Sequence, residues 1–152
     1  MIRPFRSETE RYGEYSKAGE FVYDHPFQWG SKRTGPDLAR EGSLKIKKSD
    51  TWQFNHLDDP QAVTPGSLMP SYSFLLDAEL DTARTVAKIR AMRKLGVPYA
   101  KGYENTANKD LTAQADLIRA NLLKDSVRVK PNVEVLALIA YLQRLGTDIE
   151  KK

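Results

Sequence analysis

The sequence contains no cysteine among its 152 residues. Disulfide bonds and thiolate metal sites are therefore excluded, although the lack of cysteine does not identify the cellular compartment. Long apolar runs are also missing, since no stretch approaches the roughly 18 to 20 apolar residues that span a bilayer. Residues 1–6 lack the apolar core of a secretory signal peptide. At 40% hydrophobic and 29% charged residues, the composition indicates one soluble domain with a buried core.

Motifs for ordinary catalysis are missing as well. The two histidines, His25 and His56, are too far apart in the sequence for the short spacing of a metal motif. The chain has no nucleophile elbow, P-loop or Rossmann glycine pattern, so hydrolase and nucleotide-binding functions have no support. We therefore expect no catalytic residue, and we interpret both histidines as structural or surface residues.

The net charge of +4 is modest, because 20 acidic residues are interspersed with 24 basic ones. The densest basic cluster comprises Lys45, Lys47 and Lys48, and no nucleic-acid motif accompanies it. This cluster indicates a solvated loop. The basic charge of the chain as a whole would suit a face that docks on acidic redox partners, or a nucleic-acid-binding module. Composition does not choose among these three.

The first half of the chain, residues 1–76, is rich in glycine, proline and aromatic residues. Ser7 and Glu10 fit a capping box, which predicts a short helix with Ser7 as its N-cap. Ser49 or Asp50 is expected to cap a second short helix over residues 52–57. We expect short segments and many turns in this half.

The second half has the periodicity of helices. Asp77 is expected to cap a helix that extends to Leu95 and stops before Gly96. Its apolar stripe has helical spacing and consists of Leu80, Ala83, Val86, Ala87, Ala91 and Leu95. After a polar loop at residues 99–109, a further helix is predicted from Asp110 to the neighbourhood of Asp125.

The last predicted helix, over residues 133–145, has little polar face. We expect Asn132 to cap it, Gly146 to end it, and the helix to be the most buried element of the protein. The residues expected to pack inward are Leu136, Ile139, Ala140 and Leu142.

Met69 lies in a segment whose backbone is restricted by Pro65, Gly66 and Pro70. A lone methionine is usually a core residue, but core packing does not require such a restricted loop. We therefore expect an irregular loop at Met69. The order of a Gly-Pro-Asp-Leu turn at residues 35–38, a Met-Pro loop and an apolar terminal helix resembles a class I c-type cytochrome.

A closer resemblance extends over roughly residues 1–100. The segments MIRPFRSETERYGEYS at 1–16 and EFVYDHPFQWGSKRTGPDLAR at 20–40 are similar to the mono-haem cytochrome c subunit of cbb3-type cytochrome c oxidases, the CcoO/FixO family. Further matches follow in the same order as in that family: Trp52, His56-Leu57, Pro60, Pro65-Gly66-Ser67, Met69-Pro70, Arg84-Thr85-Val86 and Gly96-Val97-Pro98-Tyr99.

The resemblance implies roles for individual residues. Met69 is similar to the distal axial ligand of the haem iron, and the carbonyl of Pro36 to the group that orients the proximal histidine. Leu38 would pack against the porphyrin. Arg3, Arg33 and Trp52 would contact the haem propionates. In that family the Cys-X-X-Cys-His attachment motif and a transmembrane anchor precede the segment that begins here at Met1, so we expect this chain to be the part after the attachment site, without covalent haem of its own.

The resemblance also implies a cellular setting. The intact protein would be a non-catalytic, membrane-anchored electron carrier on the periplasmic side of the bacterial cytoplasmic membrane, with haem c as its cofactor. Its partners would be the haem–copper catalytic subunit and other cytochrome c subunits of the oxidase, and no nucleic acid. The fragment could also form a homo-oligomer, because the N-terminal helix that packs on the terminal helix of class I cytochromes is missing.

The fold that we predict is therefore all-α and class I cytochrome c-like, without the N-terminal helix and the attachment segment. We expect a single domain over residues 1–152, with a haem-pocket half at 1–76, an inserted helical pair at 77–125 and the terminal helix at 131–146. Two alternatives remain at this point: an apo helical module that serves only in assembly, and the basic nucleic-acid-binding module.

Overall fold

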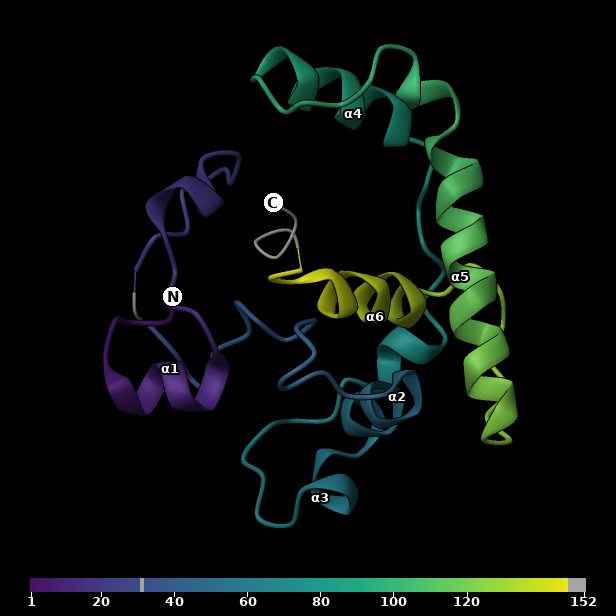
Figure 1. The fold of residues 1–152 in the computed structure, drawn as a ribbon. Coiled ribbons are helices and arrows are strands. Elements are labelled where there is room, and N and C mark those ends of the chain that lie inside the picture. Colours follow the sequence, from purple (N-terminus) through teal and green to yellow (C-terminus); the bar gives the residue numbers. More distant parts are fainter. Residues whose placement is uncertain (31, 148–152) are drawn as a thin grey trace. The chain divides into compact units, whose positions relative to one another are not determined.

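The computed structural model describes residues 1–30 and 32–147. Within these residues the chain forms helices and no strand, apart from one isolated bridge between Glu79 and Val133 (Figure 1). The prediction of an all-α fold is confirmed. The α-helices are α1 (Arg6–Tyr12), α2 (Asp50–Asp58), α3 (Pro60–Val63), α4 (Thr85–Lys94), α5 (Ala107–Lys124) and α6 (Glu134–Arg144). The 3-10 helices are η1 (Ala18–Phe21), η2 (Ser73–Leu76) and η3 (Tyr103–Asn105).

The chain divides into two compact units. The first unit contains residues 1–48 and the chain from Tyr141 onward, and the second contains residues 49–140. Helix α6 therefore contributes its beginning to the second unit and its last turn to the first. That the whole chain behaves as one domain stays a prediction.

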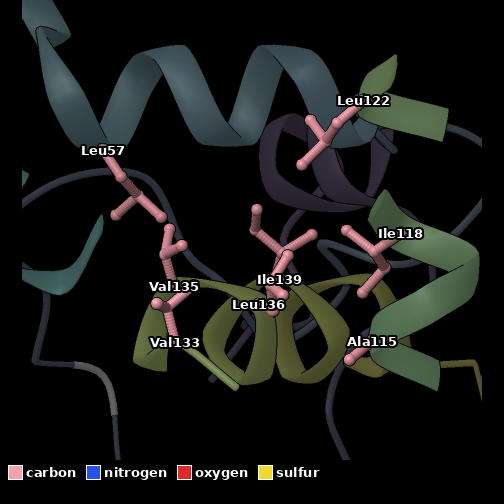
Figure 2. Close-up of a cluster of buried hydrophobic side chains, with 8 residues drawn as sticks. All are labelled: Leu57, Ala115, Ile118, Leu122, Val133, Val135, Leu136 and Ile139. Carbon is pink, nitrogen blue, oxygen red and sulfur yellow. The ribbon is translucent and has the colours of Figure 1, made fainter. Parts of the chain in front are cut away.

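The core of the second unit is built around α6. Figure 2 shows its apolar side chains pointing toward residues of α2 and α5. Val135 and Ile139 are completely buried, and Leu136 is 1% exposed. Three of the five largest fully buried side chains of the described residues come from this helix, as we predicted from its apolar character. The core cluster consists of Leu57, Ala115, Ile118, Leu122, Val133, Val135, Leu136 and Ile139.

The last turn of α6 is held in the first unit. Leu142 is buried there, and the amide of Gly42 donates a 2.9 Å hydrogen bond to the carbonyl of Leu145. A Cβ atom on Gly42 would lie 2.2 Å from the carbonyl oxygen of Gln143, so only glycine fits. Gly146 follows the helix in the left-handed region, at φ 75°, as expected for a residue that ends a helix. Ala140 is partly buried and packs against the core of the second unit.

The short helices of the first half form mostly as expected. The Ser49 hydroxyl accepts a 3.1 Å hydrogen bond from the amide of Trp52, so Ser49, rather than Asp50, caps α2. The capping box at Ser7 is wrong. Helix α1 begins two residues earlier, after Phe5, with no side-chain cap, and Glu10 instead pairs with Arg6.

The helix predicted from Asp77 is shorter than expected, because α4 begins only at Thr85. The segment before it pairs with the chain that leads into α6. The carbonyl of Ala78 accepts a 2.9 Å hydrogen bond from the amide of Glu134, and the amide of Leu80 donates a 2.8 Å hydrogen bond to the carbonyl of Asn132. Backbone groups committed to this pairing are not available for a helix. Gly96 follows the helix at φ 94°, as predicted.

Two other predicted helix starts are displaced. Helix α5 begins at Ala107 rather than after Asp110, and η3 occupies part of the predicted polar loop. Asp110 lies in the first turn of α5, where a carboxylate interacts favourably with the helix N-terminus. Asn132 has a positive φ of 57° and lies two residues before α6, so it is part of the preceding turn rather than the cap.

Candidate functional site

Met69 lies in an irregular loop, as predicted from the prolines around it. Gly66 has a φ of 80°, and the amide of Ser67 donates a 3.0 Å hydrogen bond to the carbonyl of Thr64. The Ser67 hydroxyl then accepts a 3.2 Å hydrogen bond from the amide of Met69. These bonds turn the chain so that the half-buried Met69 side chain packs against the core cluster. Leu68, its neighbour, is fully exposed.

The residues that follow Met69 are hydrogen-bonded to the end of α2. The Ser71 hydroxyl donates a 2.6 Å hydrogen bond to the carbonyl of Asp58, and the amide of Tyr72 donates a 2.8 Å hydrogen bond to the carbonyl of Leu57. The loop is therefore held on both sides of Met69. A thioether that is held in this way meets the requirement of a ligand loop, in which the donor atom needs a defined position.

Trp52 and His56 stack on one face of α2. Their ring centroids are 4.4 Å apart, with 15° between the ring planes. Both side chains are half-buried, and burial lowers the pKa of His56 below its ordinary value. His56 is therefore neutral at pH 7 and packs as an aromatic side chain, as we predicted for a structural histidine.

Arg33 is the centre of an ion-pair cluster in the first unit. Its Nη2 lies 2.7 Å from Oε2 of Glu8, and its Nε lies 2.6 Å from Oδ2 of Asp37. Arg3 also pairs with Glu8, through its backbone amide at 2.8 Å and through its guanidinium. Both carboxylates are almost buried, so their charges need this compensation. The Arg33 hydrogen bond is the main reason that the pKa of Glu8 falls to about 2.

The Gly-Pro-Asp-Leu turn at residues 35–38 exposes Pro36 and Leu38, the two residues of this turn that the resemblance singles out. Asp37 is buried, and its Oδ1 accepts a 2.9 Å hydrogen bond from the amide of Ala39. Burial alone would raise the pKa of Asp37, but this hydrogen bond and the Arg33 ion pair outweigh it and lower the pKa. With Asp37 turned inward, Pro36 is exposed and Leu38 is 50% exposed.

The six residues singled out from the sequence fall into two groups. Trp52 and Met69 belong to the second unit, where Trp52 is part of α2 and the Met69 loop is hydrogen-bonded to the end of α2. The residues of the first unit are Arg3, Arg33, Pro36 and Leu38.

Sequence reasoning missed the two carboxylates that hold the arginines. Asp37 could have been found, because it follows Arg33 by four residues on the same turn. Glu8 lies 25 residues from Arg33, and no local pattern connects them.

No helix in the described residues has both the length and the hydrophobicity needed to cross a bilayer. The described residues also contain no group of three or more histidine, aspartate or glutamate side chains that could hold a metal ion.

The all-helical fold is consistent with a cytochrome c-like domain. Comparison with protein families gives the more specific class. The family model described as "Cytochrome C oxidase, mono-heme subunit/FixO" matches residues 1–149. The chain belongs to this family, whose members are the electron-transfer subunits of cbb3-type oxidases. The comparison with curated proteins found no match.

The residues present fit one half of a haem c site. A half-buried thioether on an anchored loop is a suitable axial donor, and a thioether opposite a histidine raises the reduction potential of haem. Neither of the two thioether-forming cysteines has a counterpart in this chain. His25 and His56 lie outside any Cys-X-X-Cys-His motif, so the proximal ligand has no counterpart either.

Proposed function

We propose that this chain is the haem-binding electron-transfer domain of a cbb3-type cytochrome c oxidase and relays electrons toward the haem–copper subunit that reduces oxygen. The observation that carries the proposal is the anchored Met69 loop in a chain that matches the mono-haem subunit family over residues 1–149. In the intact protein the domain would face the periplasm and be fastened by a membrane anchor. The haem would supply the one-electron redox chemistry, so no acid or base catalyst is needed.

The proposal assigns a role to each residue that the resemblance singles out. The thioether of Met69 would bind the haem iron. The Pro36 carbonyl would orient the proximal histidine, and the exposed Leu38 side chain would cover the porphyrin. Arg3, Arg33 and Trp52 would contact the propionates. The Arg3 side chain is 44% exposed although it pairs with Glu8, so part of its guanidinium is accessible to a propionate.

We further propose that this chain by itself holds no covalent haem, because thioether attachment requires cysteine. The test is acid-acetone extraction of the purified chain after expression with the haem-attachment machinery. The proposal predicts that any haem absorbance is removed by extraction. Haem absorbance that stays with the protein would contradict it.

The electron-transfer function requires a test in the assembled oxidase. After rapid mixing of the oxidase with a reduced donor under anaerobic conditions, the haem of this subunit is expected to be reduced and then reoxidised as the haem–copper centre is reduced. Reduction of the haem–copper centre at an unchanged rate in an oxidase that lacks this subunit's haem would contradict the proposed relay.

A further inference from the structure

A strongly basic segment surrounds α4. Residues 84–101 contain six of the 24 basic residues of the chain and none of its 20 acidic residues. The rest of the chain consequently has two more acidic than basic residues, although the protein as a whole carries +4. The positive charge of this protein is therefore concentrated in one segment.

Two arginines of this segment are engaged within the second unit. Arg93 donates hydrogen bonds of 2.8 and 3.1 Å to the two carboxylate oxygens of Glu104, and Arg90 lies 3.5 Å from the same carboxylate. The Arg93 hydrogen bonds are the main cause of the low pKa of Glu104, about 2. Glu104 therefore remains ionised and joins α4 to η3, and its ion pairs are with Arg90 and Arg93 and not with the other cations of the segment.

Arg84, Lys88 and Lys94 are exposed, and in the part of the chain that the structure describes no carboxylate forms an ion pair with them. Between them runs an exposed apolar stripe of Ala87, Ala91 and Leu95, which recur every four residues and so share one face of the helix. Leu95 is 58% exposed. We call these six residues the α4 face.

The α4 face lies far from the Met69 loop within the second unit. Helix α4 packs on η3 and α5, close to the beginning of α5. Helix α2 is joined to the other end of α5, where Asn121 donates a 2.9 Å hydrogen bond to Asp50. With 18 residues and a rise of about 1.5 Å per residue, α5 is about 27 Å long. Figure 1 shows α4 near its beginning and α2 closer to its other end. A partner can therefore cover the α4 face and leave the Met69 loop accessible.

We propose that the α4 face is a docking surface for an acidic face of another protein subunit of the same oxidase. This inference rests on the proposed function, which places the chain in that assembly. The central stripe of small apolar residues with cations at its margins matches the apolar centre and polar rim of protein interfaces. The unpaired cations match a carboxylate-rich surface in charge, which favours correct orientation during association.

The composition of the α4 face favours a protein over the other anionic surfaces. A helix that lies in a membrane surface presents large apolar side chains to the lipid, whereas here two of the three apolar residues are alanine. The larger Ile89 is 9% exposed, so it is turned into the second unit. Outside residues 84–101 the chain has an excess of acidic residues, which disfavours a polyanion such as nucleic acid.

Carbodiimide cross-linking of the assembled oxidase tests the proposal, because the reagent joins a lysine amine directly to a carboxylate in contact with it. Mass spectrometry is expected to identify Lys88 or Lys94 joined to an aspartate or glutamate of another subunit. The cross-links should disappear when the oxidase is treated in high salt, since salt screens exposed ion pairs. Absence of any cross-link from these two lysines to another subunit would overturn the proposal.

Charge reversal provides a second measurement. Lys88→Glu with Lys94→Glu is expected to lower the fraction of this subunit retained in the purified oxidase at least tenfold. The matched control is Lys32→Glu with Arg128→Glu, which changes the net charge equally at two exposed basic residues outside residues 84–101 and should leave retention unchanged. Lys88→Gln with Lys94→Gln repeats the test without introducing new negative charges, and should lower retention by a smaller factor.

The remaining outcomes separate this inference from the proposed function. Equal retention of the α4 and control variants would overturn the inference. The inference would also be overturned if the Lys88→Glu, Lys94→Glu variant lost only its binding to phosphatidylglycerol vesicles, because the α4 face would then be assigned to the membrane. Normal electron flow through the variant would then still support the proposed function. An oxidase in which the haem of the wild-type subunit is never reduced would contradict the proposed function, whatever cross-links are found.

Discussion

Arg33 donates a 2.7 Å hydrogen bond from Nη2 to Oε2 of Glu8, across 25 residues of sequence. The Glu8 side chain is 10% exposed and the Arg33 side chain 19%, so the ion pair is largely shielded from water. The pair connects α1 to the segment that leads into the Gly-Pro-Asp-Leu turn. The position of that turn therefore depends on a carboxylate that must stay ionised.

The stability of the first unit should depend on the protonation of Glu8. Its pKa falls from 4.5 to about 2 in the folded chain, chiefly because of Arg33. A lowered folded-state pKa stabilises the protein fully above the unfolded-state pKa, and this stabilisation is lost as the pH falls from about 4.5 to 2. We expect Glu8→Gln to lower the melting temperature at pH 7 and to make its decline below pH 4.5 less steep.

The control for this prediction is Glu10→Gln, because the Glu10 side chain is 63% exposed in its pair with Arg6. This exposed ion pair should contribute little to the stability of the fold. Identical pH profiles for wild-type and Glu8→Gln protein, measured by circular dichroism between pH 7 and 2, would show that the Arg33–Glu8 pair does not stabilise the fold.

The helices that could be predicted are those with local signals. Ser49 caps α2 through its own side chain, and residues 133–145 form a nearly continuous apolar segment that ends before Gly146, so both helices follow from neighbouring residues. The start of α4 could not be predicted, because the pairing of Ala78 with Glu134 joins residues more than 50 positions apart. The helix propensity of residues 77–84 gave no indication of that pairing.

The residues of the candidate site likewise divide into those with a local sequence signal and those whose role depends on distant residues. Met69 was found from Pro65, Gly66 and Pro70, which restrict the backbone in any tertiary context. The carboxylate partner of Arg3 and Arg33 was missed, because Glu8 gains its role only when α1 packs near the turn. A pattern in neighbouring residues predicts a loop, whereas a compensated buried charge depends on the folded arrangement.

Gly42 should not tolerate a side chain. A Cβ atom there would lie 2.2 Å from the carbonyl oxygen of Gln143, which belongs to the backbone of α6 and cannot rotate away. We expect Gly42→Ala to destabilise the protein by about 3 kcal/mol, at the upper end of typical overpacking effects. Denaturant titration measures this change.

Gly35→Ala is the matched control for Gly42→Ala, since no atom lies within 4 Å of the position of its Cβ. It should change stability by less than about 1 kcal/mol. Equal stabilities of the two variants would contradict the close approach of the Gly42 loop to the end of α6.

Leu142 should be essential for the packing of the last turn of α6. It is 8% exposed, whereas the adjacent Tyr141 is 61% exposed. Leu142→Asp places a charge in an apolar site and is expected to cost about 4 kcal/mol or more, enough to unfold a marginally stable domain. Tyr141→Asp introduces the same charge on the surface and should leave the fold intact.

Circular dichroism and sedimentation velocity check the Leu142 prediction. A substantial dimer in the wild type that is absent in Leu142→Asp would show that a second copy covers this part of α6. A stable monomer whose melting temperature is the same in wild-type and Leu142→Asp protein would contradict the proposed packing.

The prediction of a single domain can be tested with one core substitution in each unit. Leu122 is completely buried in the second unit and Leu142 is buried in the first. Each substitution to alanine is expected to cost about 2 to 5 kcal/mol. If residues 1–152 form one domain, both variants shift a single calorimetric transition to lower temperature. Two transitions, each affected by only one substitution, would show two independently folding units.

The measurement that tests the central claim most directly is a redox titration of a version of the protein that carries a Cys-X-X-Cys-His attachment motif, with Met69→Leu and Met92→Leu compared. Met92 is half-buried in α4 and serves as the matched control, because both substitutions replace a thioether with a side chain of similar volume. The account predicts that Met69→Leu removes the thioether-ligated haem spectrum and lowers the reduction potential, while Met92→Leu changes neither. An unchanged spectrum and potential in Met69→Leu would contradict the account.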